Sequence, residues 1–241
     1  MDSGFYAACA GLRAQTQTLE LIANNVANLN TAGYRGQQPM FSSLVAALSS
    51  QPNELSDAVN NFNVLEATRI DLSPGNLERT GNPLDLGIEG SGFFAVQGKN
   101  GVLYTRNGSF QISSSGLLTT GTGEPVLGEQ GTITAPSGPI SISADGTISA
   151  NGAVVNKLRM VEFAPGSAPV AAGNAYYTAA AVRPAPYSSV RQGMLEASNV
   201  NPVSAVTELI AVQRHAEMLE RAMSLFHSNL NHIAASELPR V

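Results

Sequence analysis

Residues 5–29, FYAACAGLRAQTQTLELIANNVANL, contain the spacing of apolar residues that determines the secondary structure at the start of the chain. Alternating steps of three and four residues join two rows of mostly apolar positions, with Gln15 as the one polar member: Phe5, Leu12, Leu19 and Val26, and Ala8, Gln15, Ile22 and Leu29. Because such steps average 3.5 residues, they keep one stripe of a helix facing a partner, as in a coiled coil. The spacing predicts a helix over residues 3–29, which Gly33 ends in a left-handed conformation.

The C-terminal end repeats this pattern. Asn201 suits a helix cap and Pro202 suits the first turn, so a second helix is predicted from there to residue 235. Its two rows are Leu209, Ala216, Met223 and Leu230, and Val212, Leu219, Phe226 and Ile233. Two helices with such seams at opposite ends of one chain can pair with each other in a coiled-coil-like layer.

The middle of the chain has a different texture, in which short apolar runs alternate with turn sequences. Asn-Gly and Asp-Gly pairs readily supply the positive φ angles of tight hairpin turns. Such turn pairs are Asn100-Gly101, Asn107-Gly108, Ser115-Gly116, Asp145-Gly146 and Asn151-Gly152. The strands predicted around them cover residues 93–96, 102–105, 109–112, 140–143, 147–150 and 158–163.

These observations predict an α+β fold, mainly β, with paired terminal helices and a central antiparallel β domain. The helical domain is assigned to residues 1–35 and 198–241, and the β domain to residues 61–197. Residues 36–60 are polar and irregular and are interpreted as a linker. Residues 164–186, rich in Ala, Gly and Pro, are predicted to be mostly loop.

Composition excludes several classes of protein. The 241 residues carry a formal charge of −5 without a basic run, which argues against nucleic-acid binding. A single cysteine cannot form an internal disulfide. No run of 18 apolar residues predicts a membrane span, and the N-terminus has no Lys or Arg before Arg13, so no cleaved signal peptide is expected.

A search for catalytic, cofactor-binding or metal-binding residues identifies none. His215, His227 and His232 have spacings of 12 and 5, unlike a zinc motif, and Cys9 has no nearby base. The glycines of residues 87–92 precede a strand, whereas a dinucleotide-binding loop follows one. We therefore expect a protein that is not an enzyme, although a catalytic site in the β domain stays open as an alternative.

The apolar surface of the helices exceeds what one partner can cover. Val206 and Ile210 lie off the C-terminal seam, and the N-terminal helix has small apolar residues beyond its own seam. A helix that is apolar beyond one stripe needs several neighbours, which favours an assembly surface. The alternative is a helical hairpin packed on its own β domain.

Asparagine crowds the end of the first helix, although it is a poor helix former. Residues 23–35, ANNVANLNTAGYR, contain Asn24, Asn25 and Asn28, followed by Thr31, Gly33 and Tyr34. The low helix propensity of these asparagines suggests that their side-chain amides form hydrogen bonds that offset it. The segment resembles the N-terminal signature ANNxANxxTxGY of the bacterial flagellar axial proteins, which include rod, hook and hook-associated proteins.

Three further segments resemble the same family, in the same order along the chain. They are the start of the β domain, with Gly92, Phe93 and Phe94; the YTRxGxF hairpin, with Thr105, Arg106 and Gly108; and the GxLExSNV element, with Glu196, Ser198 and Asn199. The resemblance extends over nearly the whole chain. In the length of the chain and in the shortness of the segment after Arg35, the sequence resembles the proximal type of rod protein more than the distal type or the larger hook protein.

The resemblance implies a structural subunit of the flagellar basal-body rod, the drive shaft that crosses the periplasm. It implies export through the flagellar type III apparatus, assembly with itself and with other rod proteins through the terminal helices, and no cofactor. The residues expected in the assembly helices are Phe5, Leu12, Leu19, Ile22, Val26, Leu29, Leu209, Val212, Ala216, Leu219, Met223, Phe226, Leu230 and Ile233. A fibre subunit of a phage tail or adhesin, or a carbohydrate-active enzyme, is the alternative of another class.

Overall fold

A computed structural model describes residues 2–42, 64–135 and 138–237 of the chain. The chain divides into two compact units, each built from separate stretches of sequence. The helical unit comprises Met1–Val26, Gln37–Arg69 and Asn201–Val241, and the β unit comprises Ala27–Gly36 and Ile70–Val200. These units differ in bounds from the expected domains, because residues 27–36 and 198–200 group with the β unit and residues 37–69 group with the helical unit.

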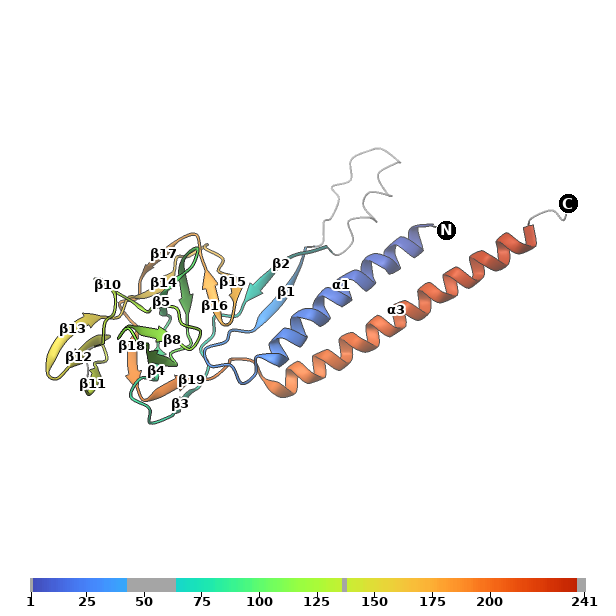
Figure 1. The fold of residues 1–241 in the computed structure, drawn as a ribbon. Coiled ribbons are helices and arrows are strands. Elements are labelled where there is room, and N and C mark those ends of the chain that lie inside the picture. Colours follow the sequence, from blue (N-terminus) through green and yellow to red (C-terminus); the bar gives the residue numbers. More distant parts are fainter. Residues whose placement is uncertain (1, 43–63, 136–137, 238–241) are drawn as a thin grey trace. The chain divides into compact units, whose positions relative to one another are not determined.

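Two long helices form most of the helical unit. Helix α1 spans Asp2–Ala27 and helix α3 spans Pro202–Glu237, close to the predicted limits. They run side by side in opposite directions (Figure 1), since Cys9 Sγ lies 3.5 Å from Met223 Sδ and Gly11 lies beside Leu219. Cys9 is half-buried.

The start of α3 and the turn after α1 have the cap and the glycine that the sequence predicts. The side-chain oxygen of Asn201 accepts hydrogen bonds from the backbone N–H groups of Val203 at 2.9 Å and Ser204 at 3.2 Å, which caps α3. After α1 the chain turns through Gly33, whose φ is 68°. Residues 37–42, inside the segment expected to be a linker, instead form a strand.

That strand, β1 (Gln37–Ser42), pairs with β2 (Val64–Ile70) in a two-stranded sheet. The linker prediction was wrong at 37–42, because hydrogen bonds from α1 and from a second strand order a polar sequence that lacks an apolar pattern. The other residues of the expected linker, 43–60, lie outside the described residues.

A six-stranded antiparallel sheet is the largest element of the β unit, with strand order β15-β16-β6-β5-β14-β17. Its central hairpin pairs β5 with β6 from Phe94 opposite Thr105 to Gly98 opposite Gly101. The strands are β5 (Phe93–Gly98), β6 (Gly101–Thr105), β14 (Met160–Phe163), β15 (Val170–Gly173), β16 (Tyr176–Thr178) and β17 (Val182–Pro184).

Three strands of this sheet fall within residues 164–186, which were predicted to be mostly loop. The other 13 of these 23 residues lie outside strands, as predicted, but the prediction did not identify β16, which lies inside the sheet between β6 and β15 and consists of Tyr-Tyr-Thr, residues that favour strands. Tyr176 and Tyr177 are both buried there.

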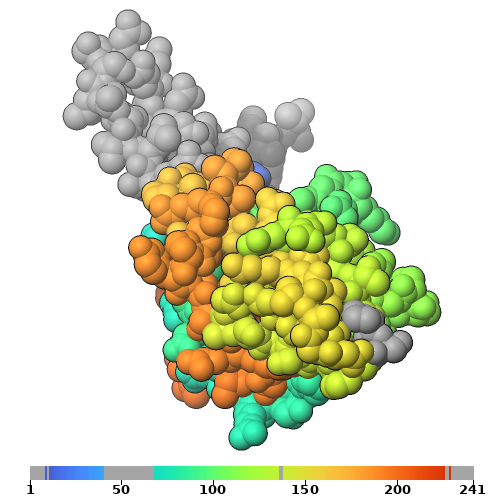
Figure 2. Space-filling model, turned by 90° about the vertical axis from the view of Figure 1, so that its left-hand side faces the viewer, coloured from blue at the N-terminus to red at the C-terminus, as the bar shows by residue number. Residues whose placement is uncertain are grey.

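Smaller antiparallel pairs complete the β unit: β19 with β3, β18 with β4, β7 with β8 and β10 with β9, together with the three-stranded sheet β11-β12-β13. Figure 2 shows the segment that contains β12 and β13 in yellow at the front of one face. Their bounds are β3 (Leu77–Arg79), β4 (Leu86–Glu89), β7 (Phe110–Ile112), β8 (Leu118–Thr120), β9 (Leu127–Gly128), β10 (Gly131–Thr132), β11 (Ile140–Ile142), β12 (Thr147–Ala150), β13 (Ala153–Lys157), β18 (Ser189–Gln192) and β19 (Met194–Glu196).

The apolar core of the β unit has two clusters, and neighbouring phenylalanines of β5 enter different ones. Phe94 belongs to a cluster with Leu86, Phe110 and Val126, whereas Phe93 belongs to a second cluster with Tyr177. Successive side chains of a strand point to opposite faces, so β5 contributes to the packing on both faces of its sheet.

Candidate functional site

Three fully buried charged side chains meet in the β unit, and they come from three separate motifs of the sequence. Arg35 follows α1, Arg106 follows β6, and Glu196 ends β19. Arg35 Nη2 lies 2.6 Å from Glu196 Oε1, and Arg106 Nη1 lies 3.0 Å from Glu196 Oε2. None of the three side chains is more than 1% exposed. We call this group the buried ion cluster.

Backbone groups hold Arg106 and Glu196 in place. Arg106 donates to the carbonyl oxygens of Ile88 at 3.2 Å and Gly90 at 2.5 Å, and its guanidinium lies 4.8 Å from the ring centroid of Phe93. Glu196 Oε1 accepts a further hydrogen bond of 2.8 Å from the N–H of Gly75. The carboxylate is therefore shared by two guanidinium groups and one amide.

The buried ion cluster contains two guanidinium groups and only one carboxylate. Burial lowers the pKa of Arg106 to about 10, although the charge of Glu196 opposes that change. Within the described part of the chain, Nε and Nη1 of Arg35 and Nε of Arg106 have no hydrogen-bond partner. Unpaired buried donors are costly, so the cluster depends strongly on its single anion.

Backbone hydrogen bonds also join the segments that carry the buried ion cluster. The N–H of Gly33 donates to the carbonyl of Glu196 at 2.7 Å, and the N–H of Arg35 donates to the hydroxyl of Tyr177 at 2.8 Å. A Cβ atom at Gly33 would lie 2.2 Å from the backbone of Arg106, so no other residue fits there. Burial raises the pKa of Tyr177 to about 12, which keeps its hydroxyl protonated.

Asn199 closes the site from the C-terminal side. Its side-chain oxygen accepts from the N–H of Gly36 at 2.7 Å, and its amide nitrogen donates to the carbonyls of Asp71 and Ser73, each at 3.0 Å. One side chain thus holds together the segment after α1, the segment after β2 and the segment before α3. The neighbouring Ser198 accepts a hydrogen bond of 3.3 Å from the N–H of Val200.

The asparagines at the end of α1 also bond within the chain. Asn25 pairs with the backbone of Gln37 through two hydrogen bonds, one of 2.8 Å to its carbonyl and one of 2.9 Å from its N–H. This pairing starts strand β1 against the last turns of α1. Asn28 accepts a hydrogen bond of 3.1 Å from the hydroxyl of Thr31, while Asn24 is exposed.

The other residues of the predicted family signature lie at positions of close packing. Phe93 and Phe94 are buried, Thr105 donates to the carbonyl of Ala175 at 2.9 Å, and Gly92 donates its N–H to Ser188 at 2.8 Å. Gly108 does not form the expected hairpin turn. It lies so close to the carbonyl of Leu86 that a Cβ atom would be 1.7 Å from its oxygen.

The structure thus brings Gly33, Arg106, Glu196 and Asn199 together, residues that the sequence placed only in separate motifs. Two members of this site, Arg35 and Tyr177, were not predicted from the sequence. Arg35 closes the quoted N-terminal motif but was not selected, although a charged residue directly after such a motif was a usable signal. Tyr177 lay in a region predicted to be mostly loop, where the run Tyr176-Tyr177-Thr178, of residues that favour strands, was the usable signal.

The predicted rows of the terminal helices have mixed exposure. Ile22 and Val212 are buried, while Leu12, Leu19, Val26, Leu29, Leu209, Ala216, Leu219 and Met223 are half-buried. On α1 the most buried side chains also include Ala14 and Thr18, which lie outside both rows. The side chains of Phe5, Phe226, Leu230 and Ile233, and those of His227 and His232, lie outside the described part; His215 is exposed.

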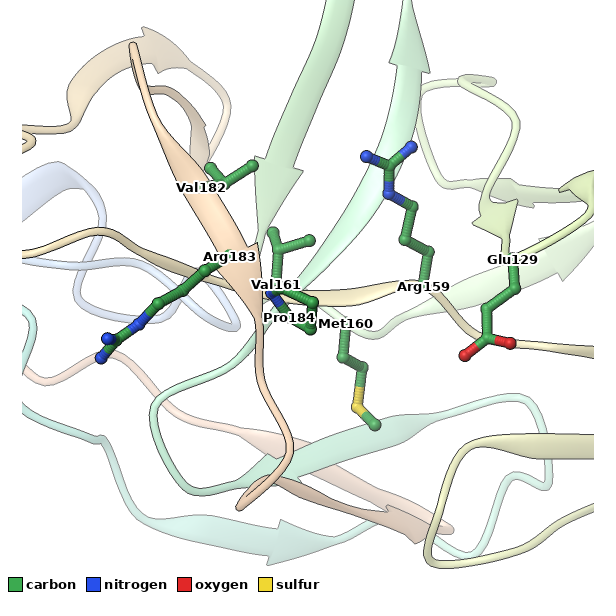
Figure 3. A pocket seen from close by; sticks show the side chains of 7 residues that line it. All are labelled: Glu129, Arg159, Met160, Val161, Val182, Arg183 and Pro184. Carbon is green, nitrogen blue, oxygen red and sulfur yellow. The ribbon is translucent and has the colours of Figure 1, made fainter.

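A shallow pocket of about 290 Å³ lies beside strands β14 and β17 (Figure 3). Val161 and Pro184 line it, together with Arg159 and Arg183, whose guanidinium groups point away from each other. Arg183 is paired with Glu162 at 2.8 Å. The charged groups of this pocket do not converge on one point, unlike those of a typical small-molecule site.

Within the residues that the structure describes, no three His, Cys, Asp or Glu side chains are grouped as metal ligands would be. Over the same residues, neither α1 nor α3 has the length and apolar character needed to cross a membrane.

Comparison with known families accounts for most of the motifs. Residues 5–35 match the model described as flagella basal body rod protein, and residues 87–150 match the flagellar hook protein FlgE/F/G D1 domain. Residues 191–234 match the flagellar basal body rod FlgEFG protein C-terminal model. The buried ion cluster draws one residue from each of these three regions.

Individual relatives cover nearly the full length. The flagellar basal-body rod protein FlgF of Caulobacter vibrioides is 33% identical over 92% of this chain and 93% of its own length. FlgF of Escherichia coli K12 is 35% identical over 95% of this chain and 96% of its own length. The rod protein FlgG of Agrobacterium fabrum is 31% identical over 90% of this chain and 92% of its own length. The chain belongs to the flagellar basal-body rod protein family, whose members are structural proteins of the flagellum.

Proposed function

We propose that this chain is a rod subunit of the FlgF type that polymerises through α1 and α3 into the periplasm-spanning drive shaft. The observation that carries the proposal is the exposure of apolar side chains on α3 where α1 does not cover it. Val203, Val206, Ile210, Met218 and Leu225 are between 44% and 76% exposed. Such a surface favours burial by other subunits.

The proposed partners are further copies of this chain and other rod proteins, and the export apparatus during secretion without a cleaved signal. In this assembly α1 and α3 form the coiled-coil-like layer that the heptad spacing predicts. The buried ion cluster supports the same function, because it joins the two ends of the β unit, at Arg35 and Glu196, into one closed structure. A closed and densely packed unit resists deformation under torque.

The function is tested by complementation of a deletion strain with the full chain and with Leu219→Asp. Leu219 lies beside Gly11 in the α1–α3 contact, where an unpaired carboxylate is expensive to bury. We expect the parent chain in purified basal bodies and restored swimming, and loss of both with Leu219→Asp. Gln213→Asp, at an exposed site of α3, is the matched control. Normal rods built from Leu219→Asp would contradict the proposal.

A distal rod subunit is the second candidate, and the full-length FlgG relative favours it. The two positions are distinguished by the basal bodies of the deletion strain. Loss of a proximal subunit leaves a shorter rod than loss of a distal one. The fibre and carbohydrate-active enzyme alternatives are not favoured, since the relatives that match nine-tenths of the chain are rod proteins.

A further inference from the structure

Three Asn-Gly pairs lie between strands of the β unit, at Asn100-Gly101, Asn107-Gly108 and Asn151-Gly152. An asparagine loses its side-chain amide most readily when glycine follows it, because glycine has no side chain to hinder attack by its own backbone nitrogen. That nitrogen must reach Cγ of the asparagine, which requires rotation of the backbone between the two residues. The fold therefore determines which of the three pairs can react.

The pair Asn107-Gly108 is held in place by hydrogen bonds and close packing. Asn107 is half-buried, and its side-chain oxygen accepts a hydrogen bond of 3.0 Å from the N–H of Ser109. The carbonyl of the buried Gly108 accepts a hydrogen bond of 3.0 Å from the N–H of Leu86. A rotation that brings the nitrogen of Gly108 to the side chain of Asn107 would break these contacts.

The pair Asn151-Gly152 is restrained by its backbone conformation. It forms the two-residue turn between β12 and β13, where φ is 52° at Asn151 and 82° at Gly152. The side chain of Asn151 also lies against Gly138 and has an interaction partner. The turn conformation and these contacts must change together before the amide of Asn151 can react.

The pair Asn100-Gly101 has none of these restraints. Both residues are exposed, at the turn that joins β5 to β6. Across the described part of the chain, no residue forms a hydrogen bond with the side chain of Asn100, and a Cβ atom at Gly101 would meet no atom within 4 Å. Gly98 opposite Gly101 is the last pair of the hairpin, so the turn can open while the rest of the ladder stays closed.

We propose that Asn100 is a modification site, at which the side-chain amide is lost by reaction with water. The nitrogen of Gly101 attacks Cγ of Asn100 and forms a C–N bond, while the side-chain nitrogen leaves as ammonia with the proton from Gly101. The product is a cyclic imide, which one water molecule then opens. Addition of water at Cγ gives aspartate, and addition at the backbone carbonyl carbon gives isoaspartate. The reaction consumes one water and releases one ammonia, without an oxidant or reductant.

The modification changes the surface of the hairpin and not its core. Both products place a new carboxylate next to the exposed Lys99, and isoaspartate also adds one methylene to the backbone of the turn. The fully buried Val96 pairs with Leu103, two pairs away from the end of the hairpin. The inference requires only the folded β unit and is independent of the proposed function.

The test incubates the full chain in a mildly alkaline buffer, which favours loss of the proton from the backbone nitrogen. Peptide mass spectrometry measures aspartate and isoaspartate at each of the three pairs. In the folded chain we expect at least about ten times more product at Asn100 than at Asn107, a ratio that corresponds to about 1.4 kcal/mol in activation free energy. Less product is expected at Asn151 than at Asn100. The matched control is Asn100→Gln, which would need a larger ring to react and should remove most of the new negative charge.

The same incubation in concentrated urea separates the effect of the fold from that of the local sequence. Glycine follows each of the three asparagines, so we expect the three pairs to react at similar rates in the unfolded chain. The inference is overturned if Asn107 or Asn151 reacts as fast as Asn100 in the folded chain. It is also overturned if Asn100 remains unmodified, or if the preference for Asn100 persists in urea.

Discussion

Arg35 and Glu196 are separated by 161 positions in the sequence, yet their side chains lie 2.6 Å apart and are both fully buried. Arg106 shares the same carboxylate from the other side. Buried ion pairs are rarely a net source of stability compared with apolar packing, but they strongly penalise the loss of one member. The single carboxylate of the buried ion cluster is therefore its most sensitive position.

Glu196→Gln removes that negative charge and leaves two buried guanidinium groups without a counter-ion. We expect the free energy of unfolding to fall by about 3–5 kcal/mol, the usual penalty for breaking a buried pair. Urea titration of the full chain, followed by circular dichroism, measures the change. Glu89→Gln is the matched control, because it breaks an exposed pair with Arg191 and should cost at most about 1 kcal/mol. Equal effects of the two changes would contradict the role of the cluster.

Gly108→Ala forces a methyl group against the carbonyl oxygen of Leu86, where a Cβ atom would be 1.7 Å away. The obstacle is backbone rather than a flexible side chain, so β4 must move. We expect a loss of more than about 3 kcal/mol in the free energy of unfolding, at the upper end of single-residue effects. Gly121→Ala meets no atom within 4 Å and serves as the control. A Gly108→Ala chain as stable as Gly121→Ala would disprove the close approach.

Asn25→Ala removes both hydrogen bonds between the end of α1 and the backbone of Gln37. We expect faster hydrogen exchange at the Gln37 amide and a loss of about 1–3 kcal/mol, since each bond contributes about 0.5–1.5 kcal/mol. Gln38→Ala, at the exposed neighbouring position, should leave that exchange rate unchanged. Unaltered exchange at Gln37 in the Asn25→Ala chain would show that the pairing does not hold β1.

Glu124 provides a pH-dependent contribution to stability. Burial alone would raise its pKa, but hydrogen bonds from Thr122, Thr120 and Tyr176 outweigh burial and lower the pKa to about 2, from an ordinary value of 4.5. Because the folded-state pKa is depressed, the stabilisation is fully present above pH 4.5 and is lost as the pH falls toward 2.

The measurement is the urea concentration at the unfolding midpoint of the full chain, from pH 6 down to about pH 2, the pKa of Glu124 in the folded chain. The same series is measured for the Glu124→Gln chain. The glutamine chain cannot titrate at this position, so its midpoint should fall less steeply over that interval. Parallel curves for the two chains would exclude the hydroxyl-bound carboxylate as a source of the pH dependence.

Periodicity in the sequence predicted the two helices closely, because steps of three and four residues determine a helical face almost independently of context. It did not identify which face of α1 is more buried. Leu12 and Leu19 were expected in the seam, but Ala14 and Thr18 are the more buried residues.

The predicted strands were confirmed, and Asn151 and Gly152, for example, both have positive φ in the β12–β13 turn. Asn107-Gly108 is the exception among the turn pairs, because the strands on either side of it, β6 and β7, do not pair with each other. Strands β15, β16 and β17 were missed because each has only three or four residues and lies between stretches rich in Ala, Gly and Pro, and partner strands supply the stabilisation.

The buried ion cluster could not be predicted by local rules. Arg35, Arg106 and Glu196 each resemble an ordinary charged residue near a turn, and only the tertiary fold makes them neighbours. Charged residues are mostly exposed in proteins, so a local reading of the sequence favours solvent for all three.

Both units of this protein are completed by residues from the last fifth of the chain. A polypeptide that emerges from the ribosome, or from any pore, with its N-terminus leading presents Arg35 and Arg106 long before Glu196 arrives to neutralise them. Helix α1 is likewise delivered first, and its partner helix α3 is delivered last. Until residues 196–237 have been delivered, the buried ion cluster lacks its carboxylate and α1 lacks its partner helix, so the order of delivery delays the completion of both units.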